Sequence, residues 1–139
     1  MSFEEKGTWL YLVIITTLPI VYFATIVSQA ASVPVADIEY QGLLLAAIGA
    51  AIGLAIVGMI AIAISSPAEA DKSDQRDKDI NRLGEYVGGL ILGFGMIVPF
   101  GLAMVEAPYF WIANGMYAVF VIAGLSGTVT KLVLYRRGF

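Results

Sequence analysis

The sequence predicts an all-α integral membrane protein, a four-transmembrane-helix bundle with its N-terminus and C-terminus both in the cytoplasm. Three observations predict this fold: the composition, four long apolar runs and the placement of the basic residues. Of the 139 residues, 59% are hydrophobic and 14% are charged, whereas a soluble domain has about 45–50% and about 25%. One small core cannot bury so much apolar surface, so lipid is the expected solvent. We expect a single membrane domain over residues 1–139.

The four apolar runs cover residues 8–27, 41–64, 86–105 and 109–134. Each is close to, or longer than, the about 20 residues that a helix needs to cross about 30 Å of hydrocarbon. The first run precedes a sequence similar to a signal-peptidase site, 28–31, but it is too long for a signal core and its leader is not positive. We expect it to be a retained helix. The connection at 106–108 is so short that the third and fourth helices must be antiparallel neighbours.

Basic residues predict the orientation of these helices. They precede the first run, lie between the second and third, or close the fourth: Lys6, Lys72, Arg76, Lys78, Arg82, Lys131, Arg136 and Arg137. The positive-inside rule therefore places both termini and the middle connection in the cytoplasm, as in a multi-pass protein of the cell membrane. Tyrosine and tryptophan near the ends of the runs agree with this placement. Lys131, close to the end of its run, is expected to extend its ammonium group to the headgroups.

Several kinds of chemistry are excluded by residue type. The chain has no cysteine and no histidine, which removes disulfides, thiol nucleophiles, imidazole bases and the usual zinc, copper and haem ligands. We expect no cofactor, no metal and no enzymatic activity. Because there is no concentrated basic run, nucleic acid is not an expected partner.

The charged cytoplasmic segment, residues 66–85, is expected to be largely helical and to continue into the third span. Ser66-Pro67-Ala68-Glu69 has a capping-box pattern that predicts a helix start. Two ion pairs along the helix are expected, Asp74 with Lys78 and Asp79 with Arg82. The segment is either a solvated helix face or a docking surface for a cytoplasmic regulator.

Part of this segment resembles a known motif. Asp74-Gln75-Arg76-Asp77, with Ile80 three residues later, is similar to the D-E-R-D-x-x-I motif of a family of small bacterial multi-span membrane proteins of uncharacterised function. The ending Tyr135-Arg136-Arg137-Gly138 is similar to the tail of that family. The resemblance covers about residues 66–139, and Gln75 departs from the family's glutamate. It implies an association with small helix-turn-helix regulators and no catalytic residues.

Glycines at four-residue spacing are the main packing signal inside the spans. They are Gly49 and Gly53 in the second span, then Gly84 with Gly88, and Gly89 with Gly93, at the third. Small residues at this spacing let helix backbones approach closely in lipid. We expect them to pack the second span against the third, with homodimerisation as the alternative. Pro19 and Pro99 are expected to bend their helices or free a carbonyl.

Few polar residues are candidates for ligand binding. Asn114, inside the fourth span, needs a hydrogen-bond partner and is expected to join two helices rather than bind a ligand. Glu106, Asp37 and Glu39 lie in the outer connections, where they could form a cation site or a proton-titrating cluster, or remain solvated acids.

These observations favour a non-enzymatic accessory, scaffold or regulatory membrane protein. It would work through helix packing, with itself as a dimer or with a larger membrane complex, and through its charged cytoplasmic segment. The alternative is a small transporter, or a cation- or proton-responsive protein using the outer acids. The first span lacks the central glutamate of the small multidrug resistance proteins, which argues against the transporter.

Overall fold

The computed structural model describes residues 1–70 and 74–138, and it is helical over most of that length. The elements, in chain order, are α1 (Phe3–Ala30), the 3₁₀ helix η1 (Val35–Asp37), α2 (Gln41–Ser65), α3 (Pro67–Ala70), α4 (Gln75–Gly95), α5 (Ile97–Met104) and α6 (Tyr109–Arg137). Within this described part, four helical stretches are long and apolar enough to cross a membrane, with α4 and α5 together making one of them. The predicted four apolar helices are therefore confirmed.

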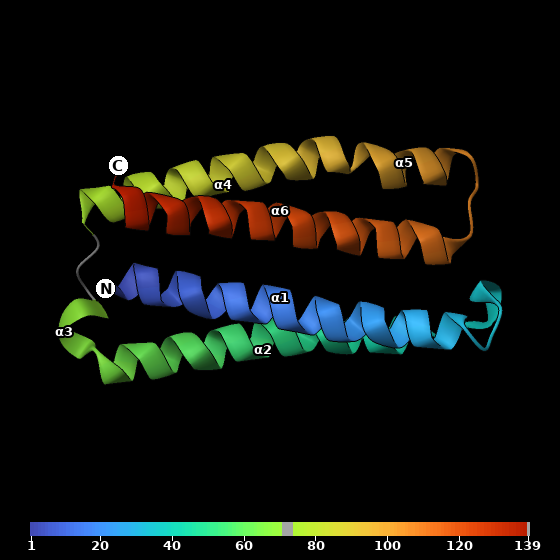
Figure 1. Ribbon diagram of the computed structural model, residues 1–139, viewed down its shortest axis with the longest axis horizontal. Coiled ribbons are helices and arrows are strands. Elements are labelled where there is room, and N and C mark those ends of the chain that lie inside the picture. The colour runs from blue at the N-terminus through green and yellow to red at the C-terminus, as the bar shows by residue number, and fades with distance from the viewer. Residues whose placement is uncertain (71–73, 139) are drawn as a thin grey trace.

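The four spans lie side by side in the order α2, α1, α6 and α4 with α5 (Figure 1). Both termini lie at one end of this row, together with α3 and the start of α4. This end is called the terminal end below, and the opposite one the far end. The fourth span packs antiparallel to the third, as the short connection predicts. The predicted packing of the second span against the third is wrong, because α1 and α6 lie between α2 and α4.

Helix boundaries follow local chemistry. Pro67 begins a helix as the capping pattern predicts, but α3 is a single turn, and the side chain of Glu69 and residues 71–73, with Lys72, lie outside the description. Asp74 starts a second helix, α4, by accepting a hydrogen bond from the Arg76 backbone N–H at 3.3 Å. As expected, α4 continues without a break from the charged segment into the third span.

Proline affects the third span more than the first. The span is interrupted at Met96, between α4 and α5, three residues before the buried Pro99. Because proline has no N–H to donate four residues back, it disrupts the helix one turn before itself. Pro19, by contrast, lies inside an uninterrupted α1.

An aromatic cluster fills the space between α1, α2 and α6 towards the far end. Tyr22, Tyr40 and Phe110 are buried in it, with the Tyr40 and Phe110 rings 5.3 Å apart in an edge-to-face arrangement. Such pairs contribute about 0.5–1.5 kcal/mol beyond the area that they bury. This cluster fixes η1 and the start of α2 on α1 and α6.

Candidate functional site

The cytoplasmic motif and the C-terminal tail, distant in sequence, meet at the terminal end. Arg76 Nη2 donates a hydrogen bond to the Tyr135 backbone oxygen at 3.3 Å. Asp77 is 5% exposed and accepts a hydrogen bond at 3.1 Å from the hydroxyl of Ser2, which also caps α1. Ile80 is fully buried. These five residues, here called the terminal junction, join α1, α4 and α6.

The contacts of the terminal junction differ from those expected of a solvated or docking motif. Asp77 and Ile80 lie inside the protein, so they cannot belong to an exposed docking surface. The expected ion pairs do not form within the described chain, since Asp74 caps α4 and Asp79 accepts a hydrogen bond from Gln75 at 3.2 Å. The exposed residues of the motif are Asp74, Gln75 and Arg76.

A polar cavity of about 470 Å³ lies beside the junction. Its lining comes from the first residues of the chain, the start of α4 and the end of α6: Met1, Ser2, Phe3, Glu5, Asp74, Arg76, Asp77 and Tyr135. The Tyr135 hydroxyl is buried beside Asp77 and Ser2, without a hydrogen bond of good geometry to any described residue. A polar cavity of this size admits water, the usual partner of such a group.

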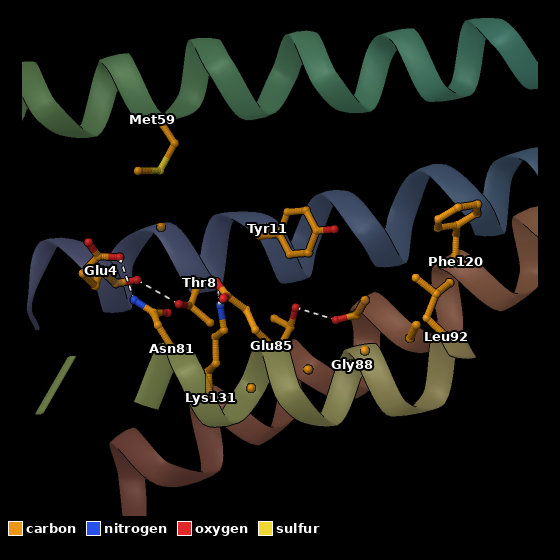
Figure 2. Close-up of a pocket in the computed structure, with 17 residues that line it drawn as sticks. Glu4, Thr8, Tyr11, Met59, Asn81, Glu85, Gly88, Leu92, Phe120 and Lys131 are labelled. Carbon is orange, nitrogen blue, oxygen red and sulfur yellow. Dashed lines mark hydrogen bonds and ion pairs between the residues drawn. The ribbon is translucent and has the colours of Figure 1, made fainter. Parts of the chain in front are cut away.

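A second cavity, of about 490 Å³, is the groove between α1 and α4, here called the α1–α4 groove (Figure 2). α6 forms its floor, and Met59 of α2 reaches its edge. Along α4 it runs from Asn81 to Leu92, and small residues dominate its walls: Gly7, Gly84, Gly88, Gly89, Ala123, Gly124 and Gly127. Among these glycines Gly89 has open space around it, whereas Gly84, Gly88 and Gly127 lie where the α4 and α6 backbones meet.

Polar groups gather at the terminal end of the groove. Asn81 Nδ2 donates to Glu4 Oε2 at 3.2 Å, which joins α4 to α1. Lys131 Nζ lies 3.8 Å from Glu85 Oε1, and the lysine side chain is 20% exposed. Its ammonium group lies at the level of Glu85, and its interfacial position remains a prediction. The aliphatic stem of Lys131 passes over Gly84, where any side chain would collide with it.

The glycines fall into two groups. Gly84 and Gly88 face α6, because a methyl group at Gly88 would lie 3.1 Å from the Ala123 carbonyl oxygen. Gly127 faces back towards α4, and a methyl group there would lie 2.7 Å from the Gly84 carbonyl oxygen. α4 and α6 therefore pack backbone to backbone at this point. Of the six glycines that the sequence singled out, the other four have nothing within 4 Å: Gly49, Gly53, Gly89 and Gly93.

Asn114 joins two helices. Its side-chain oxygen accepts a hydrogen bond from the Tyr22 hydroxyl of α1 at 2.6 Å, and its amide donates to the Phe110 carbonyl at 2.9 Å. Both Tyr22 and Asn114 are buried. This is the interhelical contact that the sequence suggested, and it leaves Asn114 inside the aromatic cluster rather than in a ligand site.

The outer acids do not assemble into a cation site. Glu106, Asp37 and Glu39 are all exposed, and no group of three or more carboxylates among the described residues is close enough to hold a metal ion. Glu106 instead occupies a left-handed backbone position, with φ of 55°, in the turn between α5 and α6. Of the two alternatives that the sequence left open, solvated acids agree with this exposure.

The α4–α6 contact has a sequence signal on both helices. Ala123-x-x-x-Gly127 in the fourth span has the same spacing as Gly84-x-x-x-Gly88, and the two pairs face each other. Tyr22, the partner of Asn114, had no comparable signal, because an aromatic residue in an apolar run is usually part of the core. No family model, no curated protein and no solved structure matches the chain.

Proposed function

We propose that this chain is a non-enzymatic accessory or scaffold component of a membrane complex, which packs through α2 against a transmembrane helix of a partner subunit. The observation that carries the proposal is the position of α2. It lies at one edge of the row and packs chiefly against α1. None of its 25 residues, all of them described, is buried.

The outer face of α2 has the form of a helix-packing surface. Gly49 and Gly53 lie one turn apart with nothing near them, flanked by the exposed Leu45, Ile48 and Ile52. Lipid gives no hydrophobic drive for helices to associate, so close backbone packing at small residues supplies most of the attraction. A partner helix could seat against these glycines with the large residues on either side.

The polar residues within the spans support a role without catalysis. Ser126, Thr128 and Thr130 each donate a hydrogen bond to a backbone carbonyl one turn earlier in α6. Asn114 is used between helices. These groups are committed to helix structure and packing.

The test is a mild-detergent pull-down of the tagged full-length protein from its native membrane, followed by mass spectrometry and mass photometry. Wild type is compared with the double variant Gly49→Leu/Gly53→Leu and with a matched control, Gly93→Leu, at an equally open position on the other edge. We expect a stoichiometric membrane partner with wild type and with the control, and its loss with the double variant. A wild-type protein that elutes as a monomer, or a partner retained by the double variant, would contradict the proposal.

A homodimer broken by the double variant is a third outcome. This outcome would support the contact through α2, but the partner would be a second copy of this chain and not another membrane protein.

A further inference from the structure

The α1–α4 groove has the length and the polarity of one membrane leaflet. From Asn81 to Leu92 it follows α4 over 12 residues, which is 11 steps, or about 17 Å at 1.5 Å per step. One leaflet with its headgroup region is about 20 Å thick, so Asn81 and Glu85 are expected at headgroup depth and residues 86–92 within the predicted third span. The polar residues lie at its terminal end, where the headgroups are expected, and Leu92 and Phe120 lie at the deep end.

We propose that this groove binds one phospholipid with a zwitterionic amine headgroup, phosphatidylethanolamine, from the leaflet next to the two termini. One acyl chain lies along the small residues of α4 and α6, and the headgroup meets the polar residues at the terminal end. The site is on the opposite side of α1 from the outer face of α2, so it is independent of the proposed association through that helix.

The charges at the terminal end of the groove complement both charges of the headgroup. Lys131, whose ion pair with Glu85 is 3.8 Å long, is the cation for the phosphate. Asn81 has a second amide N–H besides the one that it donates to Glu4. Glu4 and Glu85 are carboxylates that accept from an ammonium group. One cation and two carboxylates do not favour a purely anionic headgroup, and a choline headgroup has no N–H to donate.

A helix of a second copy does not fit the groove. The groove follows α4 only from Asn81 to Leu92, less than half of the span Gln75–Met104. A transmembrane helix would need a channel along the whole span, whereas a lipid chain needs only one leaflet.

The experiment uses the full-length protein, reconstituted into vesicles of equal parts phosphatidylethanolamine, phosphatidylcholine and phosphatidylglycerol, then extracted and weighed by native mass spectrometry. We expect one retained phosphatidylethanolamine per chain, enriched about five-fold over the other two lipids. An enrichment of this size is the effect expected of one partly exposed charge contact. Equal retention of the three lipids, or none, would overturn the proposal.

Two glycines on α4 separate groove binding from lipid that merely surrounds the protein. Gly89 lines the groove and Gly93 does not, yet both have open space around them. Gly89→Leu should fill the groove and abolish the retained lipid, and Gly93→Leu should not. If the two variants retain equal amounts of lipid, the groove is not a lipid site. The same conclusion follows if Gly89→Leu changes the oligomeric state but not the amount of retained lipid.

Headgroup contacts are tested by Lys131→Met, which keeps the stem over Gly84, and by Glu85→Gln. We expect Lys131→Met to lower total retention about five-fold. Glu85→Gln should remove the preference for ethanolamine over choline and leave total retention unchanged. A thermal melt of each variant checks folding, and unaltered lipid selectivity in both folded variants would overturn the assignment of the headgroup.

Discussion

Gly127→Ala is the sharpest perturbation of the α4–α6 contact. The added methyl group would lie 2.7 Å from the Gly84 carbonyl oxygen, whereas ordinary contact begins at 3.4 Å, so the two helices must separate by the difference, about 0.7 Å. The contacted atom belongs to the backbone of α4 and cannot rotate away. Overpacking of this kind costs about 1–3 kcal/mol of folding free energy.

Alanine also favours a helix over glycine by up to about 1 kcal/mol, which would offset part of this cost. The matched control Gly93→Ala gains the same propensity, but it meets nothing within 4 Å. The free energy of unfolding of Gly127→Ala should therefore be about 1–3 kcal/mol below that of Gly93→Ala. Denaturant titration in mixed micelles, followed by the fluorescence of Trp9 and Trp111, measures both values. A difference under about 0.5 kcal/mol would refute the backbone-to-backbone contact, because overpacking would then cost less than its usual range.

Three further variants test other parts of the fold. Tyr22→Phe leaves the Asn114 side-chain oxygen without its donor and should lower the free energy of unfolding by about 0.5–2 kcal/mol; an unchanged titration would contradict that hydrogen bond. Asp77→Ala removes the acceptor for Ser2 and should speed hydrogen exchange at the first turn of α1, and unchanged protection there would argue against the terminal junction. Glu106→Gly relieves a left-handed backbone position and should leave the protein as stable or up to about 1 kcal/mol more stable; a clear loss of stability would mean that Glu106 makes a necessary contact.

The number of the spans could be predicted from sequence because each span depends on local composition. A run such as 41–64 contains no charge over the length needed to cross a bilayer, and α2 occupies Gln41–Ser65. The break in the third span was also local, since Pro99 acts on the turn just before it. Both termini lie at one end of the row, and their cytoplasmic location remains a prediction from the basic residues.

The order of the helices could not be predicted in the same way. A helix that is apolar on all sides has no polar face to show which side meets a neighbour, so Gly49 with Gly53 and Gly84 with Gly88 looked equivalent. The structure buries one pair against α6 and exposes the other. The difference is set by the chain path through α1 and α6, which no local pattern records.

The candidate sites depended on distant contacts and were predicted least well. Asp77 has the pattern of a surface charge on a helix, yet its partner Ser2 is 75 residues earlier in the sequence, at the start of the first span. The groove is defined by residues from four separate helices, and its polar end combines Glu4, Asn81 and Lys131. Each of these is unremarkable within its own segment.

The central claim is that the outer face of α2 contacts a partner helix, and site-specific photo-cross-linking in the native membrane tests it most directly. A photoreactive residue is placed at Gly53, and for comparison at Gly93, both of which have open space. We predict a single defined protein adduct from position 53 and lipid adducts alone from position 93. Lipid adducts alone from position 53 would contradict the claim.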